Sequence, residues 1–198
     1  MEKYLTINKS NWAKIVIKKS RFFSRILFVS SNVEIENILQ HIKREYKNST
    51  HIVYAYRLNK GNYIEDYFTD AGEPKYSSGP PILQHLQQKN LVNVLLVVIR
   101  YYGGIKLGIG GLIRAYSESA SIAIKNAKII EKVIYYKIAV STDYENIGNT
   151  IKLIKKNNGR IVDVKYGEQI EVITKITKDQ FGKFSNFRII EKLDDKYY

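Results

Sequence analysis

Residues 100–116 read RYYGGIKLGIGGLIRAY and contain five glycines, all between residues 103 and 111. Glycine lets backbone N–H groups approach an anion without a Cβ in the way, and a following helix adds its positive N-terminal end. The spacing fits neither a GxxxxGK[ST] loop nor a GxGxxG loop, because Ile113 stands where the last glycine is needed. Apolar residues inside the loop favour a tight, buried turn: Ile105, Leu107, Ile109 and Leu112.

Three cations surround this turn, namely Arg100, Lys106 and Arg114. If the turn folds back, their side chains and the exposed amides would form one anion-accepting patch that faces water. The alternative is that the arginines pair internally with Asp70 or Glu73. The sequence leaves both open.

The segments beside the turn predict a buried strand followed by a helix. LVNVLLVVIRYY is nearly all apolar and rich in β-branched residues, which is typical of a strand buried on both faces. LIRAYSESASIAIKNA has the small and apolar residues of a helix packed closely on a sheet. The pair Ser31 and Glu34 predicts a capping box at the start of a helix that continues to residue 46.

Other strands and turns complete this first unit. Alternating residues predict strands over the opening segment, and again over 51–58 and 63–69, which a hairpin joins. The stretch 70–81 holds all three prolines and is expected to be irregular, with a short helix over 82–88.

A second unit is expected to begin near residue 134. YYKIAVS predicts a strand, and Thr142 with Glu145 a capping box at the start of a helix. GRIVDVKYG and QIEVITKIT predict two more strands, followed by a final helix over 178–190. The order βαββα predicts a ferredoxin-like unit. We therefore expect an α+β protein with domains at 1–131 and 132–198.

Composition limits the classes of function. The chain has 198 residues, a net charge of +13 concentrated in residues 1–134, and no cysteine. The absence of cysteine excludes disulfides and thiolate metal sites and fits a reducing cytoplasm. The three histidines lack metal-ligand spacing, and no apolar run is long enough to span a bilayer. We expect no metal, no cofactor and no membrane association. The charge favours a polyanionic partner, although frequent lysine under AT-rich codon usage is an alternative.

Four motifs, in order, resemble the YigZ/IMPACT family: KKSRFFSRILFVSS, HIVYAYRL, DAGEPKYSSGPPIL and VVIRYYGGIKLGIGGLIRAYSESA. The resemblance to the N-terminal domain of that family covers about residues 10–127. It implies a first α/β domain with the fold of the second domain of a small-subunit ribosomal protein, also found in domain IV of elongation factor G. The remainder resembles the small ferredoxin-like C-terminal domain of bacterial members, similar to domain V of that factor.

The resemblance also implies a function in translation. Eukaryotic relatives regulate translation by competing for the activator of a starvation-sensing kinase, and nucleic-acid or ribosome binding is the usual inference for bacterial members. We therefore expect a non-enzymatic, cytoplasmic, nucleic-acid- or ribosome-associated protein with a role in translation regulation or stress response. The sequence leaves open the identity of any RNA, the oligomeric state and the mobility between domains.

Family positions supply the candidate residues. The expected anion-binding set is Arg100, Lys106, Arg114, Arg57 and Tyr101. The expected structural network is Ser20, Arg21, His51, Tyr56, Asp70, Gly72, Glu73, Pro74, Gly103, Gly104, Gly108, Gly110 and Gly111. Where relatives usually read DDGEPSGTAGRP, this chain has DAGEPKYSSGPP, with departures at Ala71, Lys75, Tyr76 and Pro80. The lost carboxylate weakens any site built on paired acids.

Tyrosines among the cations suggest stacking on bases, provided that the rings are exposed: Tyr54, Tyr56, Tyr101, Tyr102 and Tyr116. An enzyme acting on a phosphorylated or nucleotide substrate is an alternative, with His51, Asp70 and Glu73 as acid–base groups. No set of nucleophile, base and orienting residue is legible, so catalysis stays uncertain. A protein-interaction module is the third hypothesis.

Overall fold

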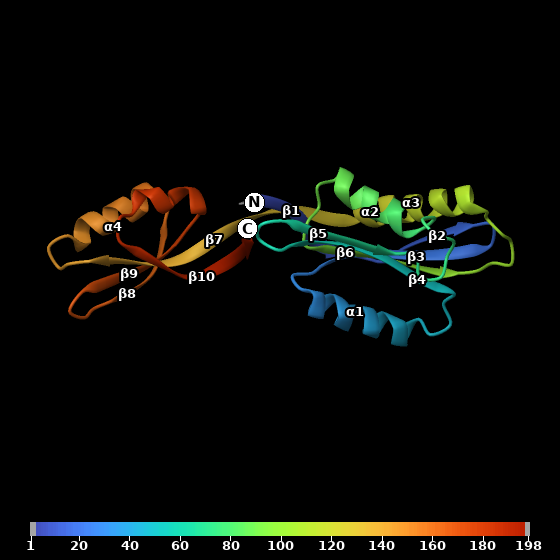
Figure 1. Cartoon of the computed structure of the whole chain (residues 1–198), viewed down its shortest axis with the longest axis horizontal. Helices are drawn as coiled ribbons and strands as arrows, with labels where there is room; N and C mark the ends of the chain where they lie inside the picture. Colours follow the sequence, from blue (N-terminus) through green and yellow to red (C-terminus); the bar gives the residue numbers. More distant parts are fainter. Residues whose placement is uncertain (1–2, 197–198) are drawn as a thin grey trace. The chain divides into compact units, whose positions relative to one another are not determined.

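The computed structural model describes residues 3–196 and has an α+β fold with two compact units (Figure 1). The first unit spans residues 4–130, and the second contains residues 131–196 together with Lys3. The expected boundary after residue 131 falls inside β7 (Ala127–Thr142), one continuous strand. We retain 1–131 and 132–198 as proposed domains.

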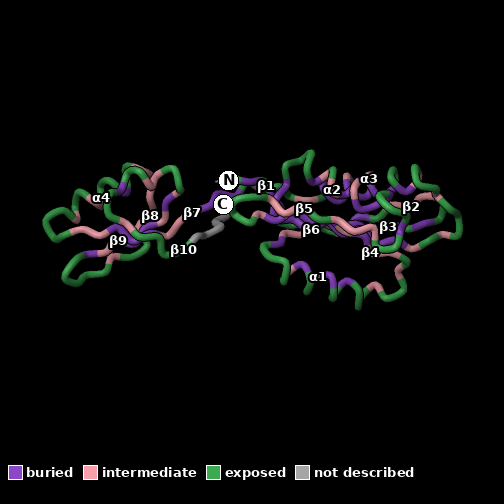
Figure 2. The backbone as a smooth tube through the Cα atoms, in the orientation of Figure 1, coloured by how far each residue is buried: buried purple, intermediate pink, exposed green. Residues whose placement is uncertain are grey.

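The first unit is built on a five-stranded antiparallel sheet of order β2-β3-β6-β4-β5. The strands are β2 (Ala13–Ile17), β3 (Ser20–Phe28), β6 (Val94–Tyr101), β4 (His51–Asn59) and β5 (Ile64–Thr69). The central strand is β6, whose residues from Val94 to Arg100 are all buried. The predicted strand with two buried faces is confirmed, and Figure 2 shows buried positions concentrated in this sheet.

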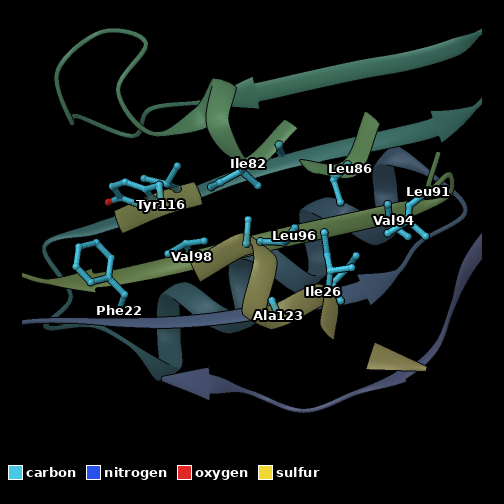
Figure 3. Close-up of a cluster of buried hydrophobic side chains, with 14 of the residues drawn as sticks. Phe22, Ile26, Ile82, Leu86, Leu91, Val94, Leu96, Val98, Tyr116 and Ala123 are labelled. Atoms are coloured by element: carbon cyan, nitrogen blue, oxygen red, sulfur yellow. The ribbon is translucent and has the colours of Figure 1, made fainter. Parts of the chain in front are cut away.

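Helices cover both faces of this sheet (Figure 1). One face, here the α2–α3 face, lies under α2 (Gly79–Gln88) and α3 (Ile109–Lys125). Its core includes Phe22, Ile26, Leu96, Val98 and Tyr116, and Figure 3 shows these side chains between strands and helices. The opposite face, the α1 face, packs Leu95, Val97 and Ile99 against α1 (Asn32–Glu45).

The helix starts differ in part from the sequence predictions. Ser31 caps α1 by accepting a hydrogen bond from Glu34 N, but the Glu34 carboxylate accepts from Ser30 N, so only half of the capping box forms. The α2 helix begins at Gly79 and not at residue 82. The prediction that Pro80 and Pro81 lie outside regular structure is therefore wrong. Pro80 and Pro81 are tolerated because the first helical turn needs no N–H donor.

The second unit centres on β7, which pairs with β9 (Ile170–Ile176) and with β10 (Phe187–Lys196). β8 (Arg160–Lys165) pairs with β9. β1 (Lys3–Ser10), which belongs to the first unit except for Lys3, is the neighbour of β7 in the same sheet. The α4 helix (Ile147–Lys156) packs Ile154 into an apolar cluster with strand residues.

Two predictions for this unit are wrong. The final helix over 178–190 is replaced by a short 3-10 helix, η1 (Lys178–Lys183), and the strand β10. Phe187, Ile189 and Ile190 suit a strand, and pairing with β7 supplies the backbone hydrogen bonds that a helix would otherwise make. The α4 helix starts at Ile147 and not at the Thr142–Glu145 pair, because the Asp143 carboxylate accepts from Asn146 N and holds a preceding turn.

Candidate functional site

The glycine stretch connects β6 to α3 and packs against the turn between β2 and β3. A Cβ atom placed on Gly103 would lie 2.0 Å from the Lys19 carbonyl carbon, so only glycine fits there. Gly103 N donates to Ser20 Oγ at 3.2 Å, which fixes the contact. Gly104 and Gly108 have φ values of 83° and 71°, in the region that favours glycine. The prediction of a tight turn is confirmed at these positions. The prediction that its apolar residues are buried is wrong for Ile105 and Ile109, which are 41% and 60% exposed.

Arg100 lies at the end of β6 on the α2–α3 face and is only 5% exposed. Its Nη1 donates to Glu73 Oε1 at 2.6 Å and its Nη2 to Ser20 Oγ at 3.4 Å. The expectation that Arg100 faces water and is free to meet a polyanion is therefore wrong, and the alternative of an internal pair with Glu73 is confirmed. Strand alternation is the cause, because Arg100 shares the face of Val98.

Glu73 is the acidic centre of this network, with a side chain 3% exposed. Its Oε1 also accepts from the Tyr116 hydroxyl at 2.7 Å. Burial raises the pKa of Tyr116 far above its usual range, and the neighbouring Glu73 carboxylate raises it further. Tyr116 therefore stays a phenol and a hydrogen-bond donor. The ring of Tyr116 packs edge-on against Phe22, as Figure 3 shows.

His51 opens β4 and lies beside the second oxygen of Glu73. Its Nδ1 donates to the Ala71 carbonyl oxygen at 2.9 Å, since a carbonyl can only accept. In the neutral ring, Nε2 is then the acceptor nitrogen, and it lies 3.8 Å from Glu73 Oε2. Gly72 has a φ of 87° and lies against the His51 ring: a Cβ placed on it would be 3.4 Å from Nδ1.

Asp70 has a different task, which is to hold the acidic turn and the start of α2. Its Oδ1 accepts from Ser78 N at 3.0 Å and Gly79 N at 2.8 Å, and its Oδ2 accepts from Tyr76 N at 2.7 Å. Burial alone would raise the pKa of Asp70, but these hydrogen bonds outweigh it and lower the pKa. Asp70 is therefore a helix-capping carboxylate.

A cavity of about 560 Å³ opens beside the Arg100–Glu73 pair; we call it the β6–α3 cavity. Its lining residues are Thr50, His51, Gly72, Glu73, Pro74, Arg100, Tyr102, Lys106, Leu107, Gly108, Ile109 and Leu112. The structure thus brings Arg100, Lys106 and Glu73 to one cavity. Arg114 does not line it; its Nη1 lies 3.6 Å from the Cβ position of Gly110, in the first turn of α3.

The other residues of the expected anion-binding set already contact side chains within the protein. Arg57 donates from Nε to Asp66 Oδ1 at 2.8 Å and from Nη1 to the Leu91 carbonyl oxygen at 3.3 Å. Its side chain is 12% exposed and already paired with Asp66, which leaves little of the guanidinium accessible to an anion. Tyr101 is half-buried on the α1 face, where the Arg21 guanidinium lies 4.9 Å from its ring centroid.

The tyrosines expected to stack on bases differ in exposure. Tyr116 is fully buried, and Tyr56 is 9% exposed with its hydroxyl donating to Glu65 Oε1 at 2.6 Å. Tyr54 is half-buried beside Tyr67. Tyr102 is 46% exposed, so of the five it offers the most accessible ring.

Sequence reasoning gave no role to Lys18 and Lys19, which form the turn between β2 and β3. Both are exposed and have positive φ values, 45° and 66°. The close contact at Gly103 sets this turn beside the β6–α3 connection. The only signal in the sequence was the KKS motif, which says nothing of its partner strand.

The sequence model of the Impact N-terminal domain family matches residues 18–124. The chain belongs to the IMPACT family. The IMPACT family member YvyE of Bacillus subtilis is 32% identical over 187 residues, covering 94% of this chain and 86% of the relative. YigZ of Escherichia coli is 26% identical over 151 residues, covering 76% of this chain and 74% of the relative. The predicted family is confirmed.

A solved structure described as a hypothetical protein has a TM-score of 0.68 at 24% identity, covering 93% of this chain and 90% of that one. It shares the fold. Within residues 3–196 no cluster of three or more His, Cys, Asp or Glu is arranged to hold a metal ion. No helix in the same range is both long and apolar enough to cross a membrane.

Proposed function

We propose that this chain is a non-enzymatic nucleic-acid- or ribosome-associated protein that acts in translation regulation or stress response. Membership of the IMPACT family supports a role in translation, since the resemblance carries that function for eukaryotic members. The net charge of +13 supports a polyanionic partner. RNA is the polyanion that this combination favours.

One observation carries the proposal, namely a group of exposed, unpaired cations around the β2–β3 turn and the β6–α3 connection. We call it the basic rim: Lys18, Lys19, Arg21, Lys106 and Arg114. None of the five forms an ion pair with an acidic residue among residues 3–196. Unpaired surface cations can neutralise phosphates and release counterions at little desolvation cost. The basic rim replaces the predicted set that included Arg100 and Arg57.

The ring of Tyr101 adds an aromatic element to the basic rim. Arg21 covers this ring, and the flat guanidinium offers a stacking face for a base as well as a charge for a phosphate. Single-stranded RNA, whose bases are free to stack, fits this surface better than a duplex.

The test is the affinity of the full chain for a fluorescently labelled single-stranded RNA, measured by anisotropy between about 50 and 200 mM salt. The triple variant Lys18→Gln, Lys19→Gln and Arg21→Gln should bind at least about tenfold more weakly. Its slope of log affinity against log salt should be shallower by about 2, because each lost phosphate contact to a single strand contributes about 0.7.

A matched control removes three exposed lysines from α4 through Lys152→Gln, Lys155→Gln and Lys156→Gln. It carries the same change of net charge and should keep most of the affinity. Equal weakening in both triple variants would indicate a general charge effect. An unchanged midpoint and salt slope in the first triple variant would contradict the proposal.

A further inference from the structure

We propose that the β6–α3 cavity binds a small hydroxylated phosphomonoester, either a sugar phosphate or a nucleoside monophosphate. This site is separate in chemistry from the basic rim, although Lys106 belongs to both. The cavity volume of about 560 Å³ lies within the range of small-molecule sites.

The polar end of the cavity offers two hydrogen-bond acceptors. Glu73 Oε2 accepts no hydrogen bond from any residue in the described range 3–196, because Arg100 and Tyr116 both donate to Oε1. His51 Nε2 lies 3.8 Å from this oxygen, beyond hydrogen-bond distance. Nδ1 donates to the Ala71 carbonyl oxygen, so in the neutral tautomer that this contact selects, Nε2 is a second acceptor.

Two acceptors without a protein donor, one on the buried Glu73 and one on the partly exposed His51, suit a ligand that donates two hydrogen bonds. Neighbouring hydroxyls of a sugar have a spacing that matches two acceptors at this separation. The Arg100–Glu73 pair is held by Ser20 and Tyr116, so the carboxylate is fixed in position before a ligand arrives. A fixed acceptor costs less ordering entropy on binding.

The other end of the cavity suits an anion. Lys106 is exposed and forms no ion pair with an acidic residue in the described part of the chain. Gly108 precedes the first residue of the 17-residue helix α3 without a capping side chain, so N–H groups of the first turn are free for a phosphate. A Cβ at Gly108 would meet nothing within 4 Å, which leaves room there.

The walls between these ends are apolar. Leu107, Ile109, Leu112 and Pro74 supply aliphatic surface for the carbon skeleton of a ligand. The exposed ring of Tyr102 is held by the Arg100 guanidinium, 5.5 Å from its centroid, and can stack on a sugar face or a base. A cavity with one end for an anion, one end for hydroxyl groups and apolar walls between them matches the parts of a phosphomonoester.

The test is isothermal titration of the full chain with ribose 5-phosphate, AMP, ribose and inorganic phosphate. Ribose 5-phosphate or AMP should bind with a Kd tighter than about 1 mM, and ribose and phosphate each at least about tenfold more weakly. If AMP binds more tightly than ribose 5-phosphate and Tyr102→Ala abolishes that difference, the ligand is a nucleotide. If the two bind equally, it is a sugar phosphate. Absence of saturable binding by both phosphomonoesters, or phosphate alone binding equally well, would overturn the proposal.

Variants locate the site. Lys106→Gln should weaken binding of the phosphomonoester about tenfold. His51→Asn keeps a donor for Ala71 but removes Nε2, and should weaken binding to a similar degree. The control Lys89→Gln removes an equal charge from an exposed position that does not line the cavity, and should leave the affinity unchanged. Unfolding midpoints report whether each variant is folded. Unchanged affinity in folded Lys106→Gln and His51→Asn would also overturn the proposal.

Discussion

The α2–α3 face and the α1 face of the central sheet hold their cations in opposite ways. On the α2–α3 face, Arg100 is 5% exposed and donates to the buried carboxylate of Glu73. On the α1 face, Arg21 is exposed and rests on the ring of Tyr101, with no acidic partner in the described residues. Arg21 and Tyr101 are paired across β3 and β6, one residue away from Phe22 and Arg100.

This difference shows that one position along a strand decides what an arginine does. Adjacent residues in a strand point to opposite faces, so a shift of one residue exchanges a buried cation for an exposed one. A buried charge must be paired, because removing it from water costs several kcal/mol. The α2–α3 face therefore has a fixed polar network, and the α1 face leaves its cation available to a partner.

The largest expected effect comes from exchanging each arginine for methionine. Arg100→Met should lower the free energy of unfolding by about 3–5 kcal/mol, since it leaves the Glu73 carboxylate buried without its cation. Arg21→Met should lower it by no more than about 1 kcal/mol, the size of an exposed cation–π contact. Urea unfolding followed by circular dichroism measures both.

The double variant Arg100→Met with Glu73→Gln provides the control for this comparison. It removes both charges and should recover part of the lost free energy of unfolding. Such a recovery would identify the unpaired Glu73 carboxylate as the cause of the loss in Arg100→Met. Equal losses for Arg100→Met and Arg21→Met would mean that the two faces do not differ in this respect.

The next effect tests the close contact between the β2–β3 turn and the β6–α3 connection. Gly103→Ala should destabilise the protein by about 1–3 kcal/mol, because the new methyl would overlap the Lys19 backbone. Gly110→Ala is the matched control, since its methyl meets only Arg114 Nη1 at 3.6 Å inside α3. The control should stabilise by up to about 1 kcal/mol through helix propensity. A neutral Gly103→Ala in urea unfolding would disprove the tight contact.

The smallest effect concerns pH at the α2–α3 contact. His85 Nε2 lies 2.8 Å from Ser117 Oγ, and burial lowers the pKa of His85, with Lys89 lowering it further. The unfolded chain therefore binds a proton at higher pH than the folded one, so this stability is present above about pH 6.5. It is lost as the pH falls through the lowered pKa. In His85→Gln, the free energy of unfolding, measured with urea at several pH values, should depend less on pH across that window. An unchanged pH dependence would contradict the assignment.

Local patterns were sufficient where neighbours in the chain decide the structure. The apolar run at 94–99 predicted the buried central strand, and Ser31 predicted the start of α1. The four motifs were sufficient for the family. Patterns failed where distant segments compete for backbone hydrogen bonds, as at β10, where pairing with β7 replaces the predicted helix.

By itself, the sequence determined most of the secondary structure and the tight glycine turn, because these follow from side-chain size, periodicity and backbone freedom within short segments. The family followed from the resemblance of its four motifs. The tertiary structure decided which cations are available. Charge is a property of a residue, but its pairing depends on what the fold brings near it: Glu73 lies 27 residues from Arg100 in the chain. The cost of an unpaired buried charge makes that contact obligatory, so Arg100 is not available as an exposed cation, whereas Lys18, Lys19 and Arg21 stay exposed.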